Sequence, residues 1–113
     1  MILYGIPNCD TMKKARTWLD ERGVEYTFHD YRKQGVEPAL LRPWVDRLGW
    51  EALLNRAGTT FRKLPDADKQ SLDAEKATAL MVAQPGMIRR PVLTNGDVLE
   101  VGFKPDRYAA LFG

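Results

Sequence analysis

The chain has 113 residues, of which 44% are hydrophobic and 28% are charged, a balance that excludes a disordered or low-complexity protein. Its length suits one domain, and its longest apolar run, Ala79–Ala83, is far shorter than the roughly 18 residues of a membrane span. The net charge is +2, and the basic residues stand in short pairs rather than in one long block, so we expect no direct binding to nucleic acid. The apolar start, Met1–Tyr4, is followed at once by a turn, which is not the pattern of a signal peptide. We therefore expect a cytoplasmic protein that does not bind a membrane.

The first 28 residues predict a strand, a helix and a second strand. Met1–Tyr4 is a short apolar strand, and the turn Gly5–Asn8 follows it. A helical pattern begins at Asp10 and is ended by Gly23. Alternation over Val24–Phe28 predicts the second strand. Because the intervening helix is long enough for a right-handed crossover, we expect the two strands to be parallel.

The middle of the chain is predicted to be mostly helical. After a polar loop at His29–Gly35, Pro38 suits the first turn of a helix that ends at Gly49, and Pro43 is expected to bend it. The other expected middle elements are a further turn at Trp50–Leu54, a loop at Asn55–Leu64, a short helix at Pro65–Lys69 and a helix at Asp73–Ala83 capped by Asp73.

The last part of the chain predicts a hairpin followed by a helix. Val92–Thr94 and Asp97–Val101 are apolar strands joined by Asn95–Gly96, a strong hairpin signal, and Pro105 opens the final helix. The order of elements predicts an α/β protein with a thioredoxin-like fold, in which helices flank one mixed sheet. We expect a single domain over residues 1–113, with the helical middle, about residues 38–83, inserted as a lobe.

Cys9 is the only cysteine, so an internal disulfide is excluded and a metal site is not expected. A lone cysteine is usually a small buried hydrophobic residue. Cys9, however, stands at the start of the first predicted helix, where unpartnered amide N–H groups and the helix dipole stabilise a thiolate. Such a position lowers a thiol pKa from about 8.5 to between about 3.5 and 7.5, and the thiolate is the nucleophile. The position therefore favours a reactive Cys9 over a buried one.

The neighbours of Cys9 have opposing effects on its ionisation. Asp10 opposes a thiolate, whereas Lys13, one turn along the helix, favours it if its ammonium folds back. Asn8 and Thr11 are able to donate hydrogen bonds to the sulfur or to a bound oxyanion. The alternative roles are turn formation and helix capping for Asn8 and Thr11, and a solvated helix face for Lys13.

The spacing around Cys9 selects among thiol chemistries. A dithiol oxidoreductase needs a second cysteine three residues on, where this chain has Met12. A phosphatase-like loop needs an arginine six residues on, where it has Ala15. The remaining chemistry is that of a single thiol, whose adduct is released by a thiol from another molecule. Glutathione is the abundant cytosolic candidate.

A second signal lies before the hairpin, at Arg90 and Pro91. In thioredoxin-like folds a cis-proline precedes the third strand and faces the active cysteine, and it leaves a backbone edge on which a substrate peptide pairs. Arg90 beside it is suited to hold a carboxylate or oxyanion through a fork of hydrogen bonds. A solvated loop position is the alternative for Arg90.

Three segments in order resemble a known family. Gly5–Ala15, Gly58–Leu64 and Ile88–Leu93 are similar to the opening, middle and late motifs of the arsenate reductase (ArsC)/Spx family, and above all to its small YffB-type ArsC-like proteins. The resemblance spans nearly the whole chain. It implies a thioredoxin-like fold with a helical insertion, and it implies that Pro91 is cis.

The resemblance also implies a set of site residues. Arsenate reductases of the family use one cysteine, which corresponds to Cys9, and three arginines around the oxyanion. The arginine before the cis-proline corresponds to Arg90. The first of the three falls near Asn55 and Arg56, with Asn55 favoured, and the third falls on Lys104. Lysine offers only a point charge where an arginine fork satisfies two oxygens, so the oxyanion site is incomplete.

We therefore interpret the chain as resembling a glutathione-dependent thiol reductase in which Cys9 forms a mixed disulfide. Its expected partners are glutathione, glutaredoxin and a disulfide substrate, either a small molecule or a protein, with no tightly bound cofactor. One alternative is an arsenate reductase of the ArsC type. The other is a regulator like Spx that binds RNA polymerase, although Met12 removes the Cys-x-x-Cys switch of many Spx proteins.

Overall fold

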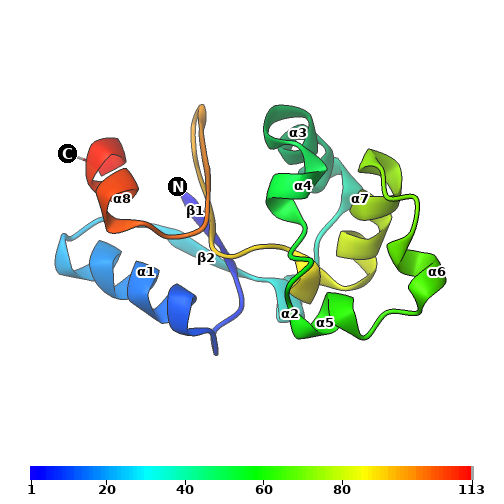
Figure 1. Ribbon diagram of the computed structural model, residues 1–113. Helices are drawn as coiled ribbons and strands as arrows, with labels where there is room; N and C mark the ends of the chain where they lie inside the picture. The colour runs from blue at the N-terminus through cyan, green and yellow to red at the C-terminus, as the bar shows by residue number, and fades with distance from the viewer. Residues whose placement is uncertain (113) are drawn as a thin grey trace. The chain divides into compact units, whose positions relative to one another are not determined.

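The computed structural model describes residues 1–112 and contains one mixed sheet (Figure 1). The order of strands is β2-β1-β3-β4, with β1 parallel to β2 and antiparallel to β3, and with β3 antiparallel to β4. The predicted parallel pair and the predicted hairpin are both confirmed. The strands are β1 (Ile2–Gly5), β2 (Thr27–Asp30), β3 (Val92–Asn95) and β4 (Val98–Val101).

Helices account for most of the remaining described residues. The predicted order of strand, helix, strand, helical middle, hairpin and final helix is confirmed, and so is the α/β class. The helices are α1 (Asp10–Glu21), α2 (Tyr31–Gln34), α3 (Pro38–Leu48), α4 (Trp50–Leu53), α5 (Thr59–Arg62), α6 (Asp66–Lys69), α7 (Ala74–Ala83) and α8 (Pro105–Phe112), with a 3-10 turn, η1 (Pro85–Met87), after α7.

The chain forms two compact units. The first consists of Met1–Asp30 together with the chain from Arg90 onward, and it holds the sheet, α1 and α8. The second consists of Tyr31–Arg89 and holds the helices α2 to α7. None of the helices described is long and apolar enough to cross a membrane.

In the first unit, α1 and α8 cover one face of the sheet (Figure 1). Leu3 of β1 is paired with Leu93 of β3, and both side chains are fully buried beneath the helices. The apolar residues of α1 recur at helical spacing and meet them, as the sequence pattern predicts. This core consists of Leu3, Met12, Ala15, Trp18, Leu19, Leu93 and Tyr108.

Tyr108 lies at the centre of an aromatic cluster within that core. Its ring makes edge contacts with Trp18, at 5.5 Å between centroids, and with Phe103, at 4.8 Å. The hydroxyl is buried and has no hydrogen-bond partner among the described residues. Burial, with a smaller contribution from the negative charge of Glu100, raises the pKa of Tyr108 well above its ordinary value. An unsatisfied buried hydroxyl costs stability.

We therefore expect Tyr108→Phe to raise the free energy of unfolding by about 1 kcal/mol at neutral pH. Above pH 10.0, the ordinary pKa, the unfolded tyrosine loses a proton that the folded one keeps, so the wild type loses stability as pH rises. Tyr108→Phe removes that part of the loss. Urea unfolding at neutral and alkaline pH measures both effects.

Tyr26→Phe is the matched control, because the Tyr26 hydroxyl accepts a hydrogen bond from Arg16 Nε at 3.1 Å. This variant is expected to lose stability. A Tyr108→Phe variant less stable than the wild type would show that the buried hydroxyl has a partner.

Two predictions for the start of the chain were wrong in their boundaries. The second strand is Thr27–Asp30 rather than Val24–Phe28, and the segment predicted as a loop, His29–Gly35, contains the end of β2 and all of α2. Pairing with β1 selects the strand residues, because the ladder joins Ile2 to Thr27 at one end and Gly5 to Asp30 at the other. The apolar residues before Thr27 pack against the core without joining the sheet.

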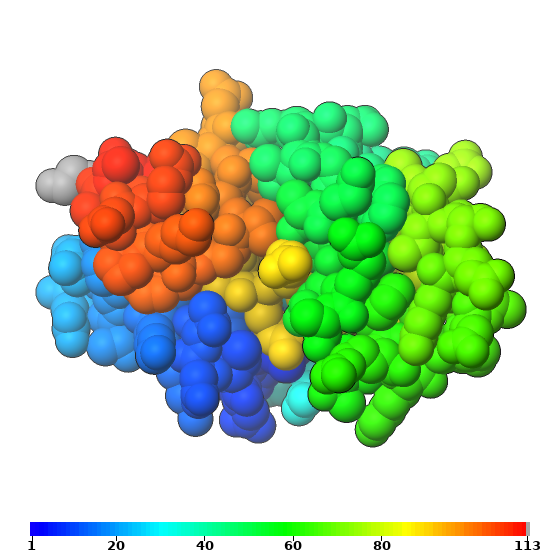
Figure 2. Space-filling view, viewed as in Figure 1, coloured from blue at the N-terminus to red at the C-terminus, as the bar shows by residue number. Residues whose placement is uncertain are grey.

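The hairpin turn differs from the predicted one by a single residue. Asn95 still belongs to β3 and pairs with Val98, so the two turn residues are Gly96 and Asp97. Gly96 has a φ of +58°, in the left-handed region that favours glycine. The tip of this hairpin, orange in Figure 2, is exposed.

The second unit confirms most of its predicted helices. Pro38 begins α3, Pro43 lies within it, and Asp73 caps α7. The predicted loop Asn55–Leu64 was wrong in part, because it contains the one-turn helix α5, whose residue Phe61 is buried. A single buried side chain stabilises this turn, and one turn is too short to show helical periodicity.

Asp73 satisfies a free amide of α7, since its carboxylate accepts a hydrogen bond from Lys76 N at 2.8 Å. We expect Asp73→Ala to lower the free energy of unfolding by about 1 kcal/mol. Asp73→Asn keeps an acceptor at the same place and should retain most of the stability. Chemical unfolding of the three proteins tests this, and equal losses in both variants would contradict a capping role.

Candidate active site

Cys9 occupies the N-cap of α1, with φ −121° and ψ 132°, and its carbonyl accepts a hydrogen bond from Lys13 N at 2.9 Å. The side chain is half-buried against the core of the first unit. Gly5, at the end of β1, permits this arrangement, because a Cβ there would collide with the sulfur of buried Met12. The short turn from strand to helix thus places the thiol beside the free amides of the first helical turn.

The surroundings of Cys9 lower the pKa of its thiol below its ordinary value. Partial burial acts most strongly and opposes ionisation. It is outweighed by the amide of Met12, the guanidinium of Arg90 and the amide of Thr11, which hydrogen bond to the thiolate, and by the positive charge of Arg90. Hydrogen-bond donors and a positive charge stabilise a thiolate more than a neutral thiol. These groups therefore act on the charged, nucleophilic form.

Arg90 reaches the site from the segment that leads into β3. The peptide bond between Arg90 and Pro91 is cis, as the resemblance implies. Pro91 is buried, and its carbonyl accepts a hydrogen bond from Gly102 N at 2.8 Å, which ties the start of β3 to the end of β4. Arg90 is thereby held directly before a paired strand, beside the sulfur.

The other predicted site residues of the first unit lie around this centre. Asn8 is exposed in the turn before Cys9, and Thr11 contributes its amide. Lys13 is exposed and lines a shallow groove along α1, and Lys104 is exposed between β4 and α8. Within residues 1–112, no hydrogen bond or ion pair joins Asn8, Lys13 or Lys104 to the thiol.

Asn55 and Arg56 belong to the second unit. Asn55 N donates to the carbonyl of Met87 at 2.8 Å, and the Asn55 side chain lies against Gly58, where a Cβ would come within 2.8 Å of its amide nitrogen. The guanidinium carbon of Arg56 is 5.5 Å from the centre of the Trp50 ring. Both side chains thus have contacts within their own unit.

The amide of Met12 is the one contributor that the sequence interpretation missed. The position itself was the available signal, because the third residue of a helix offers a free amide to the N-cap side chain. No group of three or more histidine, cysteine or acidic residues within 1–112 is arranged to hold a metal ion.

A sequence model of the ArsC family matches residues 4–111, nearly the whole chain. The chain belongs to the ArsC family. An uncharacterized protein of Haemophilus influenzae is 37% identical over 110 residues, which cover 97% of this chain and 96% of that protein. The global transcriptional regulator Spx of Listeria innocua is 30% identical over 92% of this chain and 80% of its own length.

Solved structures of ArsC-related proteins share the fold. YffB is 60% identical, with a TM-score of 0.97 over 99% of this chain and 98% of its own. An ArsC-related protein of Brucella melitensis is 55% identical, with a TM-score of 0.78 over 98% and 92%. Arsenate reductase from Vibrio cholerae, at 18% identity, has a TM-score of 0.83 over 98% and 96%, which shows the fold alone. The predicted thioredoxin-like, ArsC-type fold is thus confirmed.

Proposed function

We propose that this member of the ArsC family is a glutathione-dependent reductase that uses a single thiol. The observation that carries the proposal is the position of Cys9 at the N-cap of α1, where the amides of Met12 and Thr11 and the guanidinium of Arg90 lower the pKa of its thiol. A thiolate favoured in this way attacks disulfides near neutral pH. Because the chain has no second cysteine, any disulfide of Cys9 joins it to another molecule.

The reaction has two exchange steps. The Cys9 thiolate attacks the glutathione sulfur of a mixed disulfide, so that a Cys9–glutathione disulfide forms and the substrate leaves as a thiolate that takes a proton from solvent. The thiolate of a second glutathione then attacks the glutathione sulfur on Cys9. Glutathione disulfide leaves, and the Cys9 thiolate is regenerated. One free glutathione is thus consumed per turnover: its sulfur joins the glutathione already present in the mixed disulfide, and the substrate sulfur is released as a thiol.

Arg90 has two roles in this scheme. Its charge favours the Cys9 thiolate before attack and also when that thiolate leaves in the second step. Its guanidinium is also suited to a glutathione carboxylate. Asn8, Thr11, Lys13 and Lys104 are proposed to contact the substrate in the first unit.

Further contacts and partners complete the proposal. Asn55, Arg56 and the edge at Pro91 are proposed as additional substrate contacts. Glutaredoxin is a proposed second electron donor, and the scheme operates in a reducing compartment such as the cytoplasm. The chemistry uses no tightly bound cofactor.

The test begins with reduced protein and glutathione disulfide. Mass spectrometry should find one glutathione on Cys9, and added glutathione should remove it. The protein should then catalyse the reduction of a glutathionylated peptide. No adduct at any pH, together with no turnover, would overturn the proposal.

Two alternatives have support of their own and are tested beside it. ArsC membership favours arsenate as a substrate, although lysine stands in place of one arginine of the oxyanion set. Turnover of arsenate in preference to the mixed disulfide would establish that function. The 30% identity to Spx favours a regulator, which would bind RNA polymerase in a pull-down and lack thiol turnover.

A further inference from the structure

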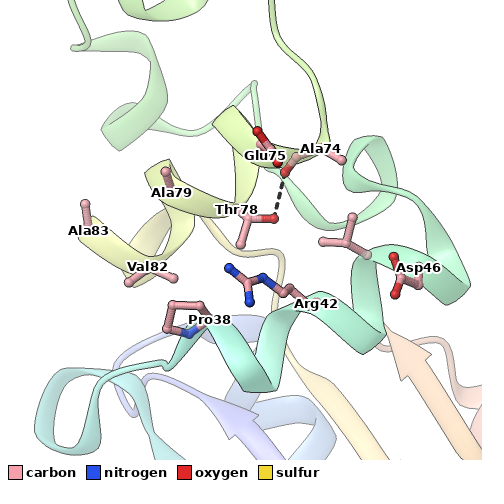
Figure 3. Close-up of a pocket in the computed structure, with 10 residues that line it drawn as sticks. Pro38, Arg42, Asp46, Ala74, Glu75, Thr78, Ala79, Val82 and Ala83 are labelled. Atoms are coloured by element: carbon pink, nitrogen blue, oxygen red, sulfur yellow. Dashed lines mark hydrogen bonds between the residues drawn. The ribbon is translucent and has the colours of Figure 1, made fainter.

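A groove runs along the second unit between α3 and α7, and Figure 3 shows the residues that form it. Its volume of about 630 Å³ lies within the range of small-molecule sites. The residues from each helix recur at helical spacing, so each helix contributes one face. The groove is lined by Pro38, Arg42, Val45, Asp46, Ala74, Glu75, Thr78, Ala79, Val82 and Ala83.

The wall formed by α7 is apolar apart from Glu75 and Thr78. It presents three alanines and a valine, whose small side chains leave the space open. Thr78 adds little polarity, because its hydroxyl donates a hydrogen bond to the carbonyl of Ala74 at 2.7 Å (Figure 3). That hydroxyl hydrogen is therefore not available to a ligand, and the wall favours a hydrocarbon body.

Arg42 is the cation of the groove. Its side chain extends from α3 toward α7, close to Pro38 and Thr78 (Figure 3). Within residues 1–112, its guanidinium takes part in no hydrogen bond or ion pair. Asp46, one turn along α3, lies beyond ion-pair distance, and such an exposed pair would add only about 0.3–0.5 kcal/mol. A ligand anion therefore has little to displace.

The charges make the two ends of the groove different. Asp46 and Glu75 lie at one end, whereas Pro38, Val82 and Ala83 form the other (Figure 3). A carboxylate bound to Arg42 would have its apolar body directed toward the second end. A second anion would be repelled by the two carboxylates at the first end. The groove thus favours one negative charge and one hydrocarbon arm.

We propose that this groove binds a small amphiphile with a single carboxylate, such as a medium-chain fatty acid, with its head on Arg42 and its chain along α7. The fork of N–H donors on arginine matches the two oxygens of a carboxylate. The apolar wall supplies affinity in proportion to the hydrocarbon area that it covers. The site lies wholly within the second unit and does not depend on the proposed reductase activity.

The test is a titration of the isotope-labelled full chain with decanoate, followed through its amide NMR signals. We expect saturable shifts concentrated in α3 and α7. Decanol, with the same chain and no charge, should bind at least about 10-fold more weakly, because it lacks the charged hydrogen bonds to Arg42. Shifts confined to other segments, or equal affinity for the two probes, would overturn the proposal.

Three variants locate the site. Arg42→Gln removes the charge and should weaken decanoate about 10-fold with little effect on decanol. Arg47→Gln is the matched control on the same helix, outside the lining, and should bind as the wild type does. Ala79→Trp fills the groove and should abolish binding of both probes. Retention of decanoate affinity in folded Arg42→Gln, checked by its amide spectrum, would contradict the assignment.

Discussion

Cys9→Ser is expected to abolish thiol exchange completely while leaving the fold at least as stable as that of the wild type. A serine hydroxyl is not ionised near neutral pH and does not attack disulfides, so neither step of the exchange can occur. The N-cap position itself favours serine, whose oxygen accepts a hydrogen bond from the first helical turn. Loss of activity and gain of stability should therefore appear in the same variant.

Two measurements separate these effects. Turnover of a glutathionylated peptide should fall to the uncatalysed rate, and urea unfolding should give a free energy equal to or above that of the wild type. Cys9→Ala is the matched control, since it also lacks the thiol but caps the helix less well, by about 1 kcal/mol relative to serine. Residual turnover in either variant would place the chemistry elsewhere in the chain.

The thiol position could be predicted from sequence because its determinants are local. A strand, a glycine-containing turn and the start of a helical pattern fall within residues 1–12, and the structure builds the N-cap from those same residues. The hairpin is also determined locally. Its turn lies only one residue from the predicted position, and Gly96 belongs to both the predicted and the observed turn. Local sequence preferences of this kind agree with the final fold, so they predict these elements well.

The parts that could not be predicted depend on contacts between distant segments. Residues 24–26 alternate like a strand but pack on the core outside the sheet, because the ladder with β1 begins at Thr27. The one-turn helices α2 and α5 are each associated with a single buried aromatic residue, Tyr31 and Phe61. No periodic pattern marks such turns, so tertiary burial decides them.

The position of Arg90 beside Cys9 depends on a contact between distant segments, yet it was predicted from the family resemblance. Arg90 lies 81 positions after Cys9 in the sequence, and no spacing rule connects them. The family resemblance suggested the pair, and the structure supplies the physical reason. β3 returns beside β1 in the sheet, so the segment before β3 lies close to the turn after β1. The antiparallel pairing of these strands is what brings the guanidinium to the sulfur.

Arg90→Gln is expected to raise the pKa of the Cys9 thiol and to lower the rate of mixed-disulfide reduction about 100-fold, because it removes the positive charge that stabilises the reacting thiolate. Glutamine keeps a hydrogen-bond donor but loses the positive charge, and both kinds of interaction lower this pKa in the wild type. The thiolate fraction at neutral pH should therefore fall. Alkylation of Cys9 across a pH series measures the pKa directly.

The pH dependence distinguishes ionisation from substrate positioning. At a pH well above the thiol pKa of both proteins, each is mostly thiolate, so the difference in their alkylation rates should shrink as pH rises. Disulfide reduction should stay slower at high pH if Arg90 also holds a glutathione carboxylate. Arg90→Lys should recover the pKa more fully than the reduction rate, because lysine restores the charge without the fork.

Arg89→Gln is the matched control, since Arg89 is an exposed neighbour that makes no contribution to the thiol pKa. It removes the same charge from the same segment and should leave both the pKa and the turnover unchanged. An equal rise in pKa for Arg89→Gln and Arg90→Gln would mean that only the general positive potential matters. A rise restricted to Arg90→Gln would instead identify a specific pair, in which sheet topology joins a helix N-cap to the segment before β3.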